Sequence, residues 1–442
     1  MASSYWCARF WHTPTSHEWM RGGAPLAYLI PYCMPLNSLL VDFNSYFASC
    51  EQQDRPELRG RPVGVVPMLA DSTCLIAASG EAKKFGVKTL TNVGEAKQLI
   101  PDIVLVVARH ELYIDFHHRA VKAVDEIAPV REVLSIDEMV CDLPSGYKSA
   151  ARAIELAHDI KCNMAKRVGE YLTVSIGIAA NTFLAKLASD MQKPNGLIIL
   201  QEHDVPEKIL HLPLRALHGI GESMEIRLNK QGIDTIAKLY AQTPEQLRSV
   251  WGGVGGDRFY ARLRGEEVKD IAHGMGSISH SHVLAPELRN KDDAYAVLNR
   301  LTQKAAMRLR KVLHYTARMA IKVKFLNGPS WEHETRFLET QDTLDLMHAL
   351  NALWLKYPKK KSLTPLQVSV VFLDLSAEDA LSARLFDDLE QTGDKKKLNA
   401  AIDDLNLRFG KKAAYFGGAH RALDHGKMAI AFNHIPDVET EK

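Results

Sequence analysis

The chain reads LLVDFN at residues 39–44 and VLSIDE at residues 133–138, and these two stretches decide its fold. Each starts with a short apolar run, typical of a buried strand, and ends in carboxylates. If the two strands are neighbours in one sheet, Asp42, Asp137 and Glu138 meet at its edge. A single acid at a strand end is more often a helix cap or a solvated loop residue, so the surrounding residues have to decide.

Converging carboxylates of this kind are typical of phosphoryl transfer. Transfer to a hydroxyl uses two divalent cations about 4 Å apart, one on the attacking oxygen and one on the leaving phosphate. Such hard cations prefer carboxylate oxygens and keep some of their water. The sequence therefore predicts a two-metal site if these acids come from rigid, neighbouring elements.

The organisation along the chain indicates several domains. With 442 residues, 46% hydrophobic and 24% charged, two to four globular domains are expected. Strands alternate with helices up to about residue 200, which favours an α+β layer. Residues 206–268 are purely helical in pattern, with Gly-rich turns. After residue 275 a separate module is predicted, with helices at 292–313 and 341–356 and strands at 318–325 and 367–375.

Composition excludes some classes of protein. The net charge is only +2, so bulk charge does not indicate a nucleic-acid partner. Six scattered cysteines without a CxxC pair argue against a disulfide framework or a zinc site and favour a reducing cytoplasm. No apolar run is long enough to cross a bilayer. Prolines interrupt the weakly apolar stretch before residue 35, so an unstructured extension, with Met34 as an alternative start, is favoured over a signal peptide.

Six blocks over residues 37–200 carry a family resemblance. They are VDFNSYFASCEQ (41–52), PELRGRPV (56–63), EAKKFGVK (81–88), SIDE (135–138), SIGIA (175–179) and AKLASDMQKPNG (185–196). In this order they resemble the Y-family, DinB/UmuC-like translesion DNA polymerases, and weaker similarity continues to about residue 375. The resemblance implies low-fidelity, template-directed addition of dNTPs to a primer 3′-end, in translesion synthesis and DNA repair.

The resemblance also implies an α+β multidomain fold, the right-hand polymerase. A palm of mixed sheet plus helices is expected at 36–46 and 109–200, and small fingers at 47–108. A helical thumb with helix-hairpin-helix turns is expected at 201–270, and a C-terminal α/β little finger at 278–377. Residues 1–35 are expected to be a disordered extension, and residues 378–442 a C-terminal tail.

Roles in the site follow residue by residue from the same resemblance. Asp42, Asp137 and Glu138 are the implied catalytic acids, and with the backbone carbonyl of Phe43 they are the implied ligands of two Mg²⁺ ions, for which Mn²⁺ is a substitute. Phe47 matches the steric gate that excludes a ribose 2′-OH; an ordinary core Phe is the alternative.

Three further residues, Ser79, Lys83 and Lys193, match positions that bind the incoming nucleotide. A cation there offsets charge on the leaving pyrophosphate, although a lysine without the motif is usually a solvated surface residue. Gly80 and Lys83 stand where many members carry Tyr and Arg, and Asn44 replaces a frequent acid. These departures resemble the bacterial polymerase V branch, and they bear on nucleotide affinity because Lys lacks the planar fork of Arg.

Several segments are candidates for holding DNA. Two Gly-rich turns let backbone N–H groups approach a phosphate, although a lone GxG is more often only a tight turn. On one predicted strand, cations alternate with apolar residues and share one face, which is either a backbone-tracking face or a solvated surface. The candidate DNA-binding residues are Gly219, Gly221, Gly253, Gly255, Arg318, Lys322 and Lys324.

Partners follow from the same reading. Leu385 and Phe386 resemble the short peptide by which bacterial polymerases bind the sliding clamp, with a local core contact as the alternative. The expected partners are primer-template DNA, the clamp and SOS accessory subunits, in the SOS response, with no membrane. The expected location is the bacterial cytoplasm, associated with the nucleoid.

Two other functions remain open from the sequence. One is a catalytically weak, Y-family-like accessory factor that binds DNA as a scaffold. The other is a small-molecule nucleotidyltransferase, which has two-metal chemistry but needs neither the hairpin turns nor the basic face. Binding of primer-template DNA separates the latter from a polymerase.

Overall fold

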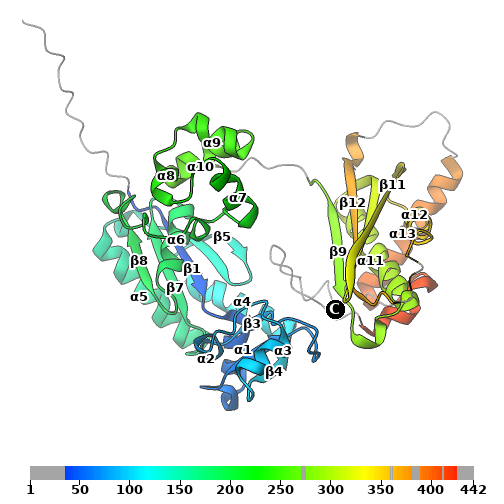
Figure 1. Ribbon diagram of the computed structural model, residues 1–442, viewed down its shortest axis with the longest axis horizontal. Coiled ribbons are helices and arrows are strands. Elements are labelled where there is room, and N and C mark those ends of the chain that lie inside the picture. Colours follow the sequence, from blue (N-terminus) through cyan, green and yellow to red (C-terminus); the bar gives the residue numbers. More distant parts are fainter. Residues whose placement is uncertain are drawn as a thin grey trace, which may run out of the picture.

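The computed structural model describes residues 35–269, 275–358, 360, 362–380, 389–410 and 413–425. In this part of the chain the first large sheet has the strand order β5-β6-β1-β7-β8 (Figure 1). Its strands are β1 (Ser38–Phe43), β5 (Val130–Ser135), β6 (Glu138–Asp142), β7 (Val174–Ala179) and β8 (Leu197–Leu200). The helices that pack on it are α4 (His110–Asp125), α5 (Ala150–Arg167) and α6 (Thr182–Met191).

Successive side chains of β1 point to opposite faces of the sheet and pack into two different hydrophobic clusters. Leu39 and Val41 pack into a cluster with residues of α4 and α5, whereas Leu40 packs into a cluster with residues of α6. Leu39 and Leu40 are fully buried, and each such side chain stabilises the fold by roughly 1.5–3 kcal/mol. Since side chains along a strand point to alternate faces, Asp42 lies on the α6 face with Leu40.

A second, smaller sheet lies in the range expected for the fingers. It has the order β3-β2-β4, with β2 and β4 parallel. Its strands are β2 (Val63–Val66), β3 (Ala77–Ala78) and β4 (Val104–Val107), and its helices are α2 (Gly80–Lys84) and α3 (Val93–Leu99). Helix α1 (Tyr46–Asp54) joins β1 to this unit (Figure 1).

Four helices follow the five-stranded sheet, as the sequence pattern predicts for 206–268. They are α7 (Glu222–Lys230), α8 (Ile236–Tyr240), α9 (Pro244–Trp251) and α10 (Gly255–Leu263). Gly256 lets α10 approach α9, because a Cβ at this position would lie 2.3 Å from the carbonyl oxygen of Leu247. The side chain of Asn181, which caps α6, donates to the carbonyl oxygens of Arg262 and Glu266 at 2.8 Å each, so this helical unit is tied to the five-stranded sheet and its helices.

The third sheet is antiparallel, with the order β11-β10-β12-β9. Its strands are β9 (Ile278–Val283), β10 (His314–Phe325), β11 (Gly328–Thr340) and β12 (Pro365–Ala377), and its helices are α11 (Lys291–Lys311) and α12 (Thr343–Trp354). The sequence pattern predicts both helices, β10 and β12, but not β9 or β11. Strand β11 is exposed on one face and only partly buried on the other, where Trp331 and Phe337 pack against the core. Few apolar residues mark that face, so the alternation typical of a half-buried strand is weak.

The segment after β12 was expected to be a C-terminal tail, but its described part contains a helix and a 3₁₀ segment. They are α13 (Leu389–Phe409) and a 3₁₀ segment, η7 (Gly417–His425). The guanidinium of Arg310 on α11 makes a two-pronged ion pair with Asp403 on α13, at 2.7 and 2.8 Å. Gln303 exchanges two hydrogen bonds with the backbone of Phe416, so this segment packs back onto α11.

Within the described residues, none of the helices is both long enough and apolar enough to cross a membrane.

Candidate functional site

Asp42 has two cross-strand neighbours. The register of β1 places Asp42 opposite Glu138 of β6 and opposite Ser175 of β7. Directly opposed residues of antiparallel strands point to the same face of the sheet. These three side chains therefore gather on the face that α6 covers, where Asp42 is only 2% exposed.

Asp137 does not share a strand with Glu138, contrary to the sequence prediction. Strand β5 ends at Ser135 and Glu138 begins β6, so Asp137 lies in the two-residue connection. The Ser135 hydroxyl donates to Asp137 Oδ1 at 2.6 Å, and the backbone N–H of Phe43 donates to the Asp137 carbonyl at 2.9 Å. Burial raises the pKa of Asp137, the Ser135 hydrogen bond opposes that rise, and the negative charge of Asp42 adds to it.

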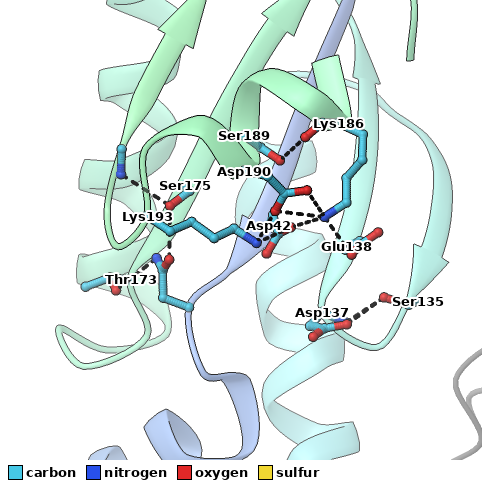
Figure 2. Close-up of polar contacts among 12 residues, drawn as sticks. Asp42, Ser135, Asp137, Glu138, Thr173, Ser175, Lys186, Ser189, Asp190 and Lys193 are labelled. Carbon is cyan, nitrogen blue, oxygen red and sulfur yellow. Dashed lines mark hydrogen bonds and ion pairs between the residues drawn. The ribbon is translucent and has the colours of Figure 1, made fainter. Parts of the chain in front are cut away.

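Helix α6 brings a lysine to these acids. Gly177 of β7 allows the approach, since a Cβ there would lie 2.0 Å from the carbonyl oxygen of Ala185. The Lys186 ammonium lies 2.5 Å from Asp42 Oδ2 and 3.0 Å from Glu138 Oε1 (Figure 2). Burial lowers the pKa of Lys186, but the charges of Asp42, Glu138 and Asp190 outweigh it and raise that pKa overall.

A second lysine reaches Asp42 from the loop after α6. Lys193 Nζ lies 2.7 Å from Asp42 Oδ2 and 2.7 Å from Asp190 Oδ1 (Figure 2). The loop is closed by Gly196, where a Cβ would lie 1.7 Å from the carbonyl oxygen of Gln192. Only glycine fits this close approach.

Side-chain hydrogen bonds tie this loop to the end of β1. The backbone N–H of Gly196 donates to the Ser175 hydroxyl at 3.2 Å, and that hydroxyl donates to Asn44 Oδ1 at 3.0 Å. The Asn44 amide in turn donates to Thr173 Oγ1 at 3.2 Å. Asn44, where the family often has an acid, therefore serves here as a neutral link between β1 and β7.

The carboxylates of Asp42, Asp137 and Glu138 are the kind of ligand that a hard divalent cation prefers. A positively charged side chain already contacts two of them. The Lys186 ammonium is held between Asp42 and Glu138, which marks a position that favours positive charge. Asp137 is bonded to Ser135 instead, and across the described ranges no three Asp, Glu, His or Cys side chains are grouped so as to hold a metal ion. Cation binding at Asp42 therefore requires its two lysine contacts to be exchanged for metal–oxygen contacts.

The predicted steric gate, Phe47, packs on one side against an aromatic ring. It stacks on Tyr113 of α4 with ring centroids 4.4 Å apart and an interplanar angle of 15°. The Tyr113 hydroxyl donates to Glu51 Oε1 at 2.8 Å. Phe47 is itself only partly buried, so one side of its ring packs against the core and the other side is accessible.

The two predicted phosphate-binding lysines come from different parts of the chain and influence one another. Lys83 lies on α2, and both desolvation and the positive charge of Lys193 lower the pKa of Lys83. Ser79, also predicted to bind nucleotide, is fully buried. Its hydroxyl accepts from the backbone N–H groups of Ala82, at 3.3 Å, and Val63, at 3.1 Å. In this structure Ser79 therefore caps α2 and anchors it to β2.

Sequence reasoning predicted Lys193 but missed two charged residues of α6, Lys186 and Asp190. They recur at i and i+4, the spacing of one helix face, and this spacing was the available signal. Glu51 is fully buried and carries ion pairs with Arg55 and Arg109. For Glu51 the pairing with Arg55 at i+4 was a local signal, whereas its other partner, Arg109, is 58 residues away and could not be paired with it from the sequence.

The two Gly-rich turns stand at helix starts. Gly219 has φ +86° and Gly221 directly precedes α7. Gly253 has φ +156°, and Gly255 is the first residue of α10. Positive φ is readily adopted only by glycine, so the two turns favour glycine at positions 219 and 253.

The predicted basic strand face also carries acids. The apolar residues of β10 are buried and the cations lie on the opposite face, as the alternation predicts. However, Arg318 pairs with Glu334 and Asp374, and Lys322 pairs with Glu332 at 2.9 Å. The neighbouring strands thus neutralise part of this face, which the sequence of β10 alone did not reveal.

The candidate clamp-binding residues Leu385 and Phe386 lie outside the described residues, as does the extension before residue 35.

Comparison with known proteins gives matches over most of the chain. The impB/mucB/samB family model matches residues 41–190, and the model of the C-terminal domain of that family matches residues 276–385. DNA polymerase IV of Moorella thermoacetica is 33% identical over 399 residues, which cover 87% of this chain and 95% of that relative. The UmuC protein of Salmonella typhimurium is 30% identical over 404 residues, covering 86% and 92%.

A solved structure has the same fold. The Y-family DNA polymerase chimera Dbh-Dpo4(243-245)-Dbh superposes with a TM-score of 0.63 at 23% identity. The match covers 77% of this chain and 99% of the chimera. Identity at this level speaks for the fold alone, and that fold is the one expected from the six sequence blocks.

Proposed function

Because this chain belongs to the Y family of DNA polymerases and is a DNA-directed translesion polymerase, we propose that it extends primers by two-metal phosphoryl transfer at Asp42, Asp137 and Glu138. The observation that carries the proposal is the register of β1, which places Asp42 opposite Glu138 on the face covered by α6. A cationic group, the Lys186 ammonium, already contacts both carboxylates.

Asp42, Asp137, Glu138 and the backbone carbonyl of Phe43 would hold the divalent ions, with Mg²⁺ as the expected ion and Mn²⁺ as a substitute. When bound, such ions polarise phosphoryl oxygens and lower the pKa of an attacking hydroxyl. The chain supplies a rigid frame for these ligands, because Asp42 and Glu138 are fixed by the β1–β6 ladder. Rigid carboxylates keep their orientation while charge develops on the transferring group.

Lys83 and Lys193 are proposed to hold the triphosphate of the incoming dNTP. They approach the acids from α2 and from the loop after α6, and their mutual repulsion favours an anion between them. Phe47 is proposed to exclude ribonucleotides, since its ring is backed by Tyr113 and cannot retreat into the core. Ser79 is buried, so we propose that it contributes to nucleotide binding only indirectly, by holding α2 and its Lys83 in place.

The DNA is proposed to be held through its phosphate backbone. Backbone N–H groups at the start of α7 and α10, reached through Gly219 and Gly253, suit phosphate oxygens. The face of β10 that bears Lys324 adds positive charge. Contacts of this kind are independent of the template sequence. The small fingers and open site that the resemblance implies are proposed to tolerate a damaged template, with low fidelity as the consequence.

We further propose that a sliding clamp binds Leu385 and Phe386 and that SOS-induced accessory subunits assist the enzyme at the nucleoid. Support for the clamp comes from the Leu-Phe peptide itself, and the accessory subunits are proposed from the family resemblance alone.

Extension of a primed template across a defined lesion tests the proposed function. The full chain, given Mg²⁺, dNTPs and a template with an abasic site, is expected to add nucleotides opposite and beyond the lesion. A non-catalytic accessory factor would bind the same DNA without extending it even on undamaged template. A small-molecule nucleotidyltransferase would not bind the DNA at all, and either result overturns the proposal.

A further inference from the structure

Asp137 differs from the other two acids in how its backbone is held. Asp42 and Glu138 belong to paired strands, whereas Asp137 and the preceding Ile136 form the connection between β5 and β6. A short connection has no strand ladder of its own, so other contacts must fix it. Ser135 and the backbone of Phe43 fix the Asp137 residue itself.

The peptide on the other side of this connection is held by a histidine of α4. His117 Nδ1 lies 2.9 Å from the carbonyl oxygen of Ile136, the residue directly before Asp137. A carbonyl oxygen only accepts hydrogen bonds, so Nδ1 carries the proton and donates it. His117 and Ile136 are 3% and 4% exposed, which keeps water from replacing this hydrogen bond.

We propose that His117 is a positioning residue for the Asp137 carboxylate. Its imidazole bridges α4 and the β5–β6 connection, so the orientation of the peptide before Asp137 follows the position of the helix. Loss of the donor would leave the buried Ile136 carbonyl unpaired, and the connection would turn toward another donor. The Asp137 carboxylate would then sample orientations that bind a divalent cation less tightly. This inference rests on the metal-binding role proposed for Asp137.

A nearly isosteric pair of variants separates the hydrogen bond from packing. His117→Asn keeps an N–H donor near the place of Nδ1, whereas His117→Leu has a similar volume and no donor. His118→Asn is the matched control, because His118 is the next residue of α4 and is exposed. Each full-length variant is titrated with Mg²⁺, both in primer extension and in thermal unfolding without DNA or nucleotide.

For His117→Leu the Mg²⁺ concentration at half-maximal primer extension is expected to rise about fivefold or more. The increase in Tm that Mg²⁺ produces should be smaller than in wild type, and the KM for dNTP should be nearly unchanged. His117→Asn and the His118 control are expected to stay within about twofold of wild type. If His117→Leu does not fold, His117→Met, a flexible apolar side chain without a donor, replaces it. A folded donor-free variant with an unchanged Mg²⁺ midpoint would overturn the inference.

The Asp137→Ala variant distinguishes this failure from failure of the proposed function. If Asp137→Ala is inactive while the donor-free His117 variant responds normally to Mg²⁺, only the role of His117 is wrong. If Asp137→Ala retains wild-type extension, the metal-binding role of Asp137 fails first.

Discussion

Asp42 and Glu138 are 96 residues apart in sequence and stand directly opposite each other across the β1–β6 ladder. The Lys186 ammonium contacts both carboxylates. Two acids on the same face of adjacent strands would repel one another without a cation between them. The two carboxylates therefore create a position that favours a positive charge, and the Lys186 ammonium occupies it.

Substitution of Gly177 by Ala is expected to displace α6 from the sheet. A Cβ at this position would lie 2.0 Å from the Ala185 carbonyl oxygen and 2.4 Å from the Ser189 nitrogen, both backbone atoms. The free energy of unfolding should fall by about 1–3 kcal/mol. Activity should also fall, because Lys186 belongs to α6 and would move away from Asp42 with that helix. Denaturant unfolding measures the first effect. Gly146→Ala, where no atom lies within 4 Å, is the control and should change stability by less than about 0.5 kcal/mol.

Substitution of Phe47 by Ala is expected to relax discrimination against ribonucleotides. Removal of the ring opens the space in front of Tyr113, so a 2′-OH no longer meets a steric barrier. The ratio of kcat/KM for dNTP over rNTP should fall by about 10²-fold, measured by single-nucleotide insertion. Phe409→Ala, at an exposed phenylalanine on α13, should leave the ratio unchanged. An unaltered ratio for the Phe47 variant would contradict its assignment as steric gate.

The cations of β10 should contribute unequally to DNA binding. Arg318 already pairs with Glu334 and Asp374, whereas Lys324 is exposed and no ion pair is found for it within the described residues. Lys324→Ala should reduce affinity for primer-template DNA and lower the salt dependence by about one ion. Arg318→Ala should do less, because the Arg318 guanidinium is already engaged by Glu334 and Asp374 and is therefore less available to a phosphate. Fluorescence anisotropy at several salt concentrations decides this, and an equal loss for both variants would show that the acids do not shield Arg318.

Binding of Mg²⁺ should weaken as the pH falls. Burial raises the pKa of Asp137 and of Glu138, and a carboxyl must be deprotonated to bind a cation. The Mg²⁺ midpoint in thermal unfolding should therefore rise as the pH falls through the raised pKa values of these carboxyls, which lie above the usual carboxyl pKa of about 4. In EDTA, without bound metal, the stability of the protein should instead increase as the pH falls. These carboxyls bind more protons in the folded than in the unfolded state, so their contribution to the free energy of unfolding grows as the pH falls through their folded pKa. A Mg²⁺ midpoint that is independent of pH would contradict this.

Much of the fold was predictable because its signals are local. The apolar run ending at Asp42, the helical period of 150–168 and the alternation of Arg318, Lys322 and Lys324 with apolar residues all survive in the structure. Glycines at 219 and 253 adopt the positive φ expected of tight turns. The Y-family resemblance, the α+β right-hand fold and the polymerase assignment are confirmed by the family models, the relatives and the solved chimera.

What could not be predicted depends on contacts between distant residues. The separation of Asp137 from Glu138 by a strand boundary follows from hairpin geometry, and the neutralisation of Arg318 follows from strand order. Strands β9 and β11 were missed because neither carries a clear apolar alternation. Residue roles at the site, including those of Phe47, Lys83 and Lys193, remain predictions.

Primer extension by the Asp137→Ala variant tests the central claim most directly. Wild type and variant are compared on the same undamaged primer-template with Mg²⁺, after circular dichroism shows that both are folded, and Asp102→Ala, at an exposed acid of the fingers, serves as the control. The account predicts that wild type and control extend the primer, whereas Asp137→Ala loses about 10³-fold or more in rate, ~4 kcal/mol of transition-state stabilisation. Extension by folded Asp137→Ala at the wild-type rate would contradict it.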